Sequence, residues 1–302
     1  MGDLEPAPPV DLSLMARPER YDIFCWSASR GCPFHCAFCT ETLTAPRYSP
    51  DGIDKIAADA AAFGESGQRW YLWVCDPLFG AGRRRTAAVS EALGSSGLEF
   101  LAESRVDVLH PDDVPGLREA GCNLVYFGLE AVSHRSLLEL RKLPAAPARH
   151  RRYLERTRAL VEACLRSDVL PVLGVVVPVP GDTAEDLDQT LTFLGELADL
   201  GRRVGGGPDG IGPCFHAFPL RFDRGAPYDN RMEEVRAAGA TISQPEDALF
   251  DWRFIERASP TVDAAAGERF REAVRALNPT APAVRQRLLR SFPRPYMRVA
   301  LN

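Results

Sequence analysis

Short apolar, strand-like segments alternate with helix-like segments from residue 21 to residue 218 of this chain. Segment 169–177 is a nearly continuous run of Val and Leu, which is typical of a strand covered on both faces. Six β-then-α units predict parallel strands joined by right-handed crossovers. Because six strands are too few to close an eight-stranded barrel, we expect the α/β class with an open, partial (βα)6 TIM-like barrel. The strands are expected at 21–27, 69–75, 98–102, 122–129, 169–177 and 211–218, and the helices at 51–63, 84–93, 111–120, 133–141, 153–166 and 182–200.

The alternation predicts three parts in the 302-residue chain. Residues 1–20 are an N-terminal extension, residues 21–220 are the (βα)6 core, and residues 221–302 are a C-terminal extension. The last part is rich in Pro and Arg, and we expect it to cover the mouth or the edge of the barrel with helices at 265–277 and 283–290. The glycine-dense stretch 201–212 lacks the Lys-Ser/Thr ending of a phosphate loop, so we interpret it as a connector.

Composition excludes several classes of protein. Hydrophobic residues are 45% and charged residues 25% of the chain, which excludes disorder, collagen and coiled coil as whole-chain descriptions. The formal net charge of −5 argues against a polyanionic ligand, so we do not expect a nucleic-acid partner. The N-terminus lacks the basic and apolar segments of a secretory signal, and the longest apolar run is too short to span a bilayer. We therefore expect a cytoplasmic protein without membrane association.

Three of the eight cysteines, Cys32, Cys36 and Cys39, form a C-x3-C-x2-C cluster directly after the first expected strand. A structural zinc site needs four ligands, and no fourth cysteine lies nearby at regular spacing. His35 is too close to Cys36 in the chain to complete such a site comfortably. Three thiolates can instead hold an iron–sulfur cubane in which one iron stays open to bind and reduce a ligand. A zinc knuckle is the alternative.

This cluster resembles the signature of the radical S-adenosylmethionine (radical SAM) superfamily, C-x3-C-x-aromatic-C, with Phe38 as the aromatic residue. The resemblance implies that Cys32, Cys36 and Cys39 hold a 4Fe-4S cluster. Its open iron would chelate the methionine part of S-adenosylmethionine, and Phe38 would lie near the adenine. Reductive cleavage would then give methionine and a 5′-deoxyadenosyl radical that removes a hydrogen atom from a substrate. The resemblance also implies an electron donor such as flavodoxin or ferredoxin.

The resemblance extends over residues 20–230, because further motifs stand where the expected strands end. The segment Ser29-Arg30-Gly31, directly before Cys32, resembles the Ser-Arg-Gly-Cys-Pro segment that is common in the cobalamin-binding branch of the superfamily. Residues 174–183 resemble a fifth-strand pattern of the superfamily, Gly-x-Ile-x-Gly-x-Pro-Gly-Glu-Thr. Pro178 replaces the second glycine of this pattern and Asp182 replaces its glutamate; an N-cap role explains Asp182. Turn capping by Asp76 and a structural Glu103–Arg105 ion pair are open alternatives. Besides Phe38, the predicted cofactor-binding residues are Asp76, Glu103, Arg105, Glu130 and Gly174.

Two other features bear on the substrate side. The basic run from Arg141 to Arg152 is interpreted first as a solvated surface. The sharper hypothesis is that Arg141 or Lys142 binds the S-adenosylmethionine carboxylate and that the later arginines bind a substrate anion. Cys214, placed near the end of the sixth expected strand, is the candidate catalytic hydrogen-atom donor, and Cys75 is a second one. No cysteine follows Cys214, so we do not expect a conventional auxiliary cluster.

The sequence therefore predicts a radical enzyme that acts on a polar small molecule, such as a sugar, a nucleoside or an amino-acid-derived intermediate of natural-product biosynthesis. Epimerisation, dehydrogenation, decarboxylation and sulfur insertion are the outcomes considered. A methyltransferase related to the cobalamin-dependent branch is the first alternative, although only about twenty residues precede the first expected strand, too few for a cobalamin domain. A peptide maturase and a non-catalytic iron–sulfur carrier are the others.

Overall fold

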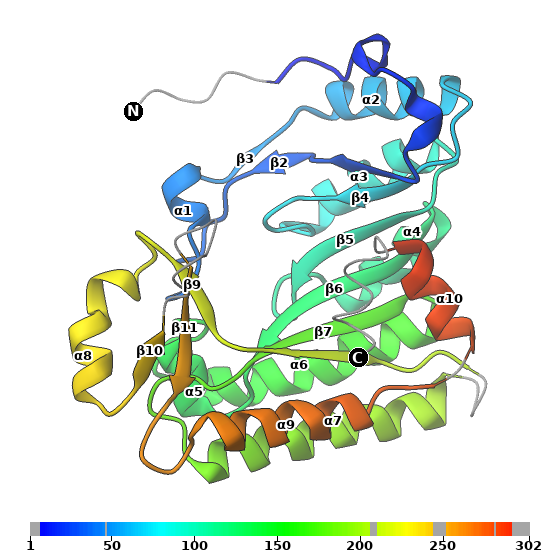
Figure 1. The fold of residues 1–302 in the computed structure, drawn as a ribbon. Coiled ribbons are helices and arrows are strands. Elements are labelled where there is room, and N and C mark those ends of the chain that lie inside the picture. The colour runs from blue at the N-terminus through cyan, green and yellow to red at the C-terminus, as the bar shows by residue number, and fades with distance from the viewer. Residues whose placement is uncertain (1–6, 46, 206–209, 244–251, 281, 292–302) are drawn as a thin grey trace.

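A computed structural model describes residues 7–45, 47–205, 210–243, 252–280 and 282–291. Its main element is one curved sheet of six strands, each hydrogen-bonded in parallel to the next (Figure 1). The strands lie in the order in which they occur along the chain, so the predicted α/β fold with an open (βα)6 sheet is confirmed. They are β1 (Ile23–Trp26), β4 (Tyr71–Val74), β5 (Phe100–Arg105), β6 (Cys122–Glu130), β7 (Leu170–Val176) and β8 (Cys214–Phe218).

Helices connect the strands and cover the outer face of the sheet. Each expected helix is present, although α6 begins earlier than expected because Pro147 occupies its first turn, where a missing N–H costs nothing. The N-cap of α7 is Thr183, which forms a capping box with Asp186; the expectation that Asp182 caps this helix was wrong. The helices are α2 (Ile53–Glu65), α3 (Arg83–Gly94), α4 (Val114–Glu119), α5 (His134–Glu139), α6 (Pro147–Arg166) and α7 (Ala184–Val204).

Several short elements were not expected from the sequence. The hairpin of β2 (Ser29–Arg30) and β3 (Ser49–Pro50), with α1 (Glu41–Thr44) between them, frames the three clustered cysteines. The C-terminal part contains a three-stranded antiparallel sheet, which no clear alternation of apolar and polar residues predicts. This sheet is made of β9 (Arg221–Asp223), β10 (Thr241–Ser243) and β11 (Trp252–Arg257), with α8 (Met232–Ala237) between its first two strands.

The two predicted C-terminal helices lie at different places on the barrel. Helix α9 (Ala264–Ala276) packs against β8 and α7, at the edge of the sheet. Helix α10 (Pro282–Ser291) contacts β4 and β6, and its Arg287 donates a hydrogen bond to the carbonyl of Asp168, just before β7 begins. It therefore lies at the amino ends of the strands. Residues 206–209 of the predicted connector are outside the described part. No described helix is both long and apolar enough to cross a bilayer.

Asp59 of α2 joins three segments at the β1 edge of the barrel. Its buried carboxylate accepts hydrogen bonds from Trp26 Nε1 at 2.8 Å, from the Val10 N–H at 2.7 Å and from Lys55 Nζ at 2.7 Å. It thereby attaches the N-terminal extension and the outward face of β1 to the same helix.

We expect Asp59→Ala to lower the free energy of unfolding by about 3 kcal/mol, because it leaves Trp26 Nε1 without its buried acceptor and leaves the Lys55 ammonium with Asp51 as its remaining carboxylate partner. Denaturant unfolding of the purified protein measures this change. Glu65→Ala, at an exposed position of the same helix, is the matched control and should change stability by less than about 0.5 kcal/mol. Equal effects of the two variants would contradict the anchoring role.

Candidate active site

The three clustered cysteines lie on the loop that follows β1 and β2, at the carboxyl ends of the parallel strands. Gly31 permits the turn into this loop: its φ is +71°, and a Cβ atom there would overlap the backbone of Arg47 and Ala45. The Ala37 N–H donates to the carbonyl of Leu140 at 2.9 Å, and the Tyr228 N–H donates to the carbonyl of Ala37 at 2.8 Å. The loop is therefore held by α5 on one side and by the C-terminal part on the other.

The sulfur atoms of the loop receive hydrogen bonds from N–H groups. Arg105 Nη1 lies 3.3 Å from Cys36 Sγ, and the Glu41 N–H lies 3.5 Å from Cys39 Sγ. Burial raises the pKa of the Cys32 and Cys39 thiols. Among the described residues, no three His, Cys, Asp or Glu side chains are arranged to hold a single metal ion. Three thiols on one loop, two of them with N–H donors, are nevertheless the donor set that fits an iron–sulfur cluster.

Arg105 is fixed at the end of β5 by contacts on several sides. Its guanidinium forms a two-bond ion pair with Asp107, with Nε–Oδ1 and Nη2–Oδ2 distances of 2.9 Å. It also stacks on the Phe34 ring at 3.8 Å and donates to the carbonyl of Lys142 at 3.0 Å. The alternative of a Glu103–Arg105 ion pair is thus wrong, because Asp107 is the partner. Sequence reasoning missed Asp107, although its position two residues after Arg105 was visible.

Glu103 lies at the other inward position near the end of β5. Trp73 Nε1 donates to Glu103 Oε1 at 2.8 Å, and burial raises the pKa of this carboxyl group. Across the neighbouring strands, the thiol of Cys75 is in contact with that of Cys25, and burial together with this neighbour raises the pKa of Cys75 to about 12. The Cys75 thiol therefore keeps its hydrogen at neutral pH.

Glu130 ends β6 in a strained conformation, with a φ of +66°. Lys142 Nζ lies 3.1 Å from Glu130 Oε1 and donates to the carbonyl of Gly128 at 2.8 Å. A side chain at Gly128 would overlap the Glu130 carboxylate and crowd Lys142. The Gly-x-Glu spacing therefore lets the carboxylate fold back over the strand, where the buried Lys142 holds it.

The other predicted cofactor ligands have structural contacts of their own. Asp76 accepts hydrogen bonds from the N–H groups of Ala28 and Ser29, at 2.6 and 3.0 Å, and from the Ser29 hydroxyl at 2.7 Å. Its carboxylate thus caps the turn that leads from β1 to the cysteine loop, and burial raises its pKa. Phe38 is half-buried against the core. Binding of S-adenosylmethionine by either residue stays a prediction.

Gly174 gives space to a tyrosine that crosses the inner face of the sheet. A Cβ atom at Gly174 would overlap the hydroxyl of Tyr126, which comes from the adjacent strand β6. His216 of β8 stands opposite Gly174, with its ring centre 5.9 Å from that of Tyr126. Burial lowers the pKa of His216 to about 4, so this imidazole is neutral at pH 7. At this level the inner face thus carries a hydroxyl group and a neutral imidazole, and Glu103 of β5 is paired with Tyr126 in the sheet.

Cys214 does not lie where the sequence suggested. It is the first residue of β8, at the amino end of the strand, and it is fully buried. The expected strand began at residue 211, whereas the sheet pairing begins only at Cys214 opposite Val172. Burial also raises the pKa of its thiol to about 12. The prediction that Cys214 lies near the mouth was therefore wrong, and its position gives no support to a role as hydrogen-atom donor.

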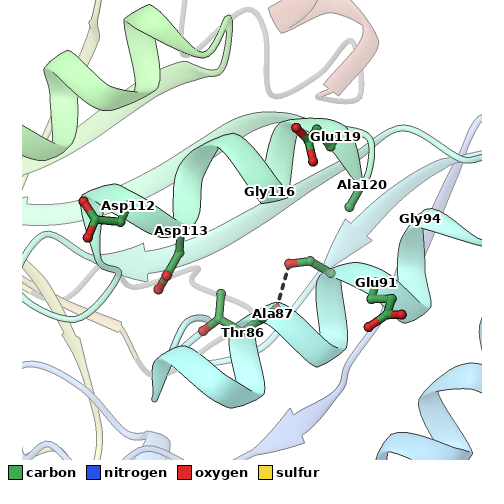
Figure 2. A pocket seen from close by; sticks show the side chains of 10 residues that line it. Thr86, Ala87, Glu91, Gly94, Asp112, Asp113, Gly116, Glu119 and Ala120 are labelled. Atoms are coloured by element: carbon green, nitrogen blue, oxygen red, sulfur yellow. Dashed lines mark hydrogen bonds between the residues drawn. The ribbon is translucent and has the colours of Figure 1, made fainter.

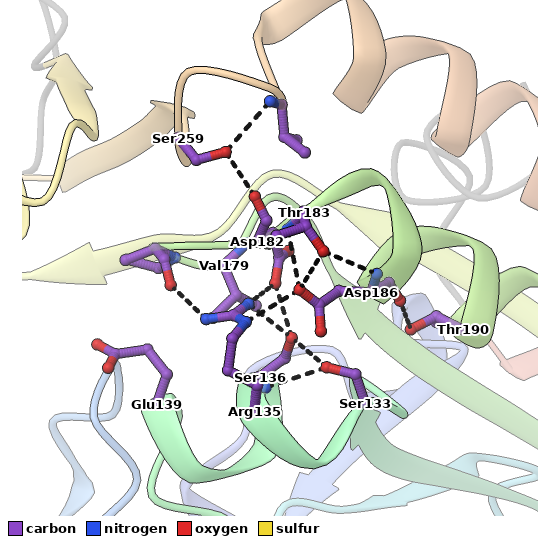
Figure 3. Close-up of polar contacts among 12 residues, drawn as sticks. Ser133, Arg135, Ser136, Glu139, Val179, Asp182, Thr183, Asp186, Thr190 and Ser259 are labelled. Atoms are coloured by element: carbon purple, nitrogen blue, oxygen red, sulfur yellow. Dashed lines mark hydrogen bonds and ion pairs between the residues drawn. The ribbon is translucent and has the colours of Figure 1, made fainter.

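A buried polar cluster joins three segments behind the end of β7 (Figure 3). Asp182 accepts hydrogen bonds from the Ser136 hydroxyl at 2.7 Å and from the Val179 N–H at 2.8 Å, and it forms an ion pair with Arg135. Arg135 also binds Asp186 at 2.9 Å. The Ser259 hydroxyl donates to the carbonyl of Asp182 at 2.6 Å. The cluster fixes the loop after β7 to α5, α7 and the C-terminal part.

The groove in Figure 2 is a separate feature. It lies on the outside of the barrel between α3 and α4, holds about 490 Å³ and is lined by Glu91, Asp112, Asp113 and Glu119 among others. None of its lining residues is a predicted site residue, so the candidate active site is the mouth at the carboxyl ends of the strands.

The family model described as the radical SAM superfamily matches residues 26–194, which is more than half of the chain. The chain belongs to the radical SAM superfamily. The prediction that it is an enzyme is therefore confirmed, and so are the predicted cofactors as those of its superfamily, a 4Fe-4S cluster and S-adenosylmethionine.

Two curated relatives each match little more than half of the chain. An uncharacterized methyltransferase of Pyrococcus horikoshii is 24% identical over 172 residues, covering 56% of this chain and 36% of that protein. Bacteriochlorophyllide d C-8(2)-methyltransferase of Chlorobaculum tepidum is 26% identical over 177 residues, covering 55% of this chain and 38% of that protein. The chain thus spans little more than a third of the length of these relatives.

Solved structures agree on the fold. The radical S-adenosylmethionine methyltransferase TsrM from Kitasatospora setae superposes with a TM-score of 0.65 at 15% identity, over 87% of this chain and 52% of that chain. The cobalamin-dependent radical enzyme OxsB superposes with a TM-score of 0.59 at 12% identity, over 82% of this chain and 40% of that chain. At these identities the likeness concerns the fold alone.

We expect Cys36→Ala to abolish loading of the iron–sulfur cluster, because it removes one of three thiolates and the sulfur that Arg105 contacts. Iron and sulfide contents after anaerobic reconstitution measure the loss, and an unchanged far-UV circular dichroism spectrum checks the fold. Cys25→Ala, an exposed thiol outside the loop, is the matched control and should load normally. Full loading of Cys36→Ala would contradict the assignment.

His216 gives a pH-dependent contribution to stability. Between a folded pKa of about 4 and an unfolded pKa near 6.5, the unfolded chain binds a proton that the folded chain does not, so stability falls as the pH falls. We expect His216→Gln to remove about 2 kcal/mol of the stability difference between pH 8 and pH 5. Denaturant unfolding at both pH values measures it; the same loss in the variant would show that His216 is not the cause.

Proposed function

We propose that this radical SAM enzyme binds S-adenosylmethionine at the carboxyl ends of its strands and uses it to abstract a hydrogen atom from a polar small molecule. One observation carries the proposal: Arg105 contacts both Cys36 and the carbonyl of Lys142, while Lys142 holds Glu130. The cysteine loop and the Glu130 carboxylate are thereby joined at a single mouth. When bound, the reduced cluster would supply the electron that cleaves S-adenosylmethionine to methionine and a 5′-deoxyadenosyl radical.

The residues of the chain have separate tasks in this proposal. Cys32, Cys36 and Cys39 would hold the cluster, and Phe38 would contribute to binding of the adenine. Glu130 is the acceptor for the amino group or a ribose hydroxyl of S-adenosylmethionine, because its carboxylate is held at the mouth by Lys142. Arg105 acts as a positioning residue that keeps the loop in place through Cys36.

The substrate side is formed by the inner face of the sheet. Glu103, Tyr126 and His216 place a carboxyl group, a hydroxyl group and a neutral imidazole there, and such groups suit a polar substrate. We therefore keep a sugar, a nucleoside or an amino-acid-derived natural-product intermediate as the substrate class. Epimerisation, dehydrogenation, decarboxylation and sulfur insertion remain the outcomes within this proposal, with an external one-electron donor.

Methyl transfer is the second candidate, and the names of the curated relatives favour it. Methylation of an unactivated carbon requires prior removal of a hydrogen atom, so in that case the two candidates share the proposed first step; a nucleophilic carbon that accepts a methyl group loses its hydrogen as a proton instead. Purification from corrinoid-supplemented cells separates them. A protein that retains corrinoid supports methyl transfer, and a corrinoid-free protein that still consumes S-adenosylmethionine favours the first candidate.

The test of the proposal is formation of 5′-deoxyadenosine by the reconstituted, dithionite-reduced protein given S-adenosylmethionine. We expect product with the wild type and none with Cys36→Ala. Glu130→Gln should keep its cluster but bind S-adenosylmethionine about ten-fold more weakly, because a charged acceptor is lost. Glu234→Gln, at an exposed site in α8, is the control. A fully loaded wild type that makes no 5′-deoxyadenosine with any substrate of the proposed class contradicts the proposal.

A further inference from the structure

Four arginines form an exposed basic surface on this otherwise acidic chain. Arg141 follows α5, and Arg149, Arg151 and Arg152 lie in the first two turns of α6; we call the four the arginine rim. All four are exposed, and within the described part of the chain none of them is seen in a salt bridge. The formal net charge of the chain is −5, so this local excess of positive charge is not a consequence of composition.

One member of the rim lies where a cation opposes helix stability, because Arg149 is in the first turn of α6. The N-terminus of a helix carries a partial positive charge, and each cation placed there costs roughly 0.3–1 kcal/mol. Helix α6 nevertheless has no acidic residue in its first turn, whereas α7 begins with Glu185 and Asp186. Helix stability therefore does not account for Arg149, whereas attraction of an anionic partner would.

The rim begins beside the cysteine loop. Arg141 stands between two residues whose carbonyl groups are bound to the site: Leu140 accepts from the Ala37 N–H at 2.9 Å, and Lys142 accepts from Arg105 Nη2 at 3.0 Å. Arg105 in turn donates to Cys36 Sγ at 3.3 Å. Arg141 itself has a φ of +53°, a conformation that costs a non-glycine residue energy. A short bonded path thus leads from the rim through Arg105 to a predicted cluster ligand.

We propose that the arginine rim is the docking surface for an acidic one-electron donor protein of the flavodoxin or ferredoxin type. The inference rests on the proposed function, because only a cluster that must be reduced needs such a donor. One electron passes from the donor to the cluster, and no atom is transferred. Four exposed guanidinium groups, three of them spread over the first two turns of α6, suit a broad acidic surface, whereas a small anion is bound by convergent, buried donors.

The experiment compares two reductants on the reconstituted protein. Anaerobic stopped-flow follows bleaching of the cluster after mixing with reduced flavodoxin or with dithionite. For Arg149→Glu/Arg151→Glu/Arg152→Glu we expect reduction by flavodoxin to be about ten-fold slower at low salt, and reduction by dithionite to stay within about two-fold of the wild type. Rising salt should slow the wild type with flavodoxin and have little effect on the variant. Because acidic residues favour a helix N-terminus, the variant should fold.

Matched single variants locate the effect. Arg152→Glu should slow reduction by flavodoxin, whereas Arg285→Glu, at an exposed position of α10 near the amino ends of the strands, should not. An unchanged rate of reduction of the triple variant by flavodoxin overturns the proposal, and binding of a substrate anion would then be the role to test for the rim. Equal slowing with both reductants also overturns it, because the arginines would then act on the cluster. Failure of the proposed function is distinguished by a different measurement: the dithionite-reduced wild type would then make no 5′-deoxyadenosine.

Discussion

The contact between the Arg105 guanidinium and Cys36 Sγ joins the cysteine loop to the sheet. A loop carrying three thiols has little reason to stay in one conformation, since it buries few apolar side chains. Arg105 supplies that constraint because Asp107 fixes its guanidinium at the end of β5, while the Phe34 ring of the loop stacks on it. Its contact with the carbonyl of Lys142 links the loop to the residue that holds the Glu130 carboxylate. The site thus depends on one buried cation with partners from three segments.

The parallel sheet explains why these segments meet. Each crossover returns the chain to the amino edge, so every strand of the sheet ends at the same mouth. Glycines then allow close approach there: Gly31 at the turn into the loop, Gly128 beneath the Glu130 carboxylate, and Gly174 beneath Tyr126. The C-terminal part completes the arrangement, because Tyr228 binds the loop through Ala37 and Ser259 binds Asp182.

The sequence was sufficient to predict the six-stranded sheet and its helices because each apolar segment is followed by a segment with helical periodicity. It failed for β9 to β11, whose strands are short and whose pairing depends on contacts distant in the chain. The spacing of the cysteines located the three clustered thiols, whereas Glu130 was predicted from the resemblance to the superfamily. Neither could reveal that Arg105 pairs with Asp107 rather than Glu103, or that Cys214 lies at the buried beginning of β8, because both depend on where a strand starts and how its side chains alternate.

Electron paramagnetic resonance of the dithionite-reduced, reconstituted protein, with and without S-adenosylmethionine, is the measurement that decides whether the chain binds both cofactors at one site. The expected arrangement is a 4Fe-4S cluster held by three cysteines, with one iron open to S-adenosylmethionine. It predicts a reduced-cluster signal that changes when S-adenosylmethionine is added, and no such signal from Cys36→Ala. A cluster signal that is indifferent to S-adenosylmethionine, or a protein that retains zinc and forms no cluster, would contradict it.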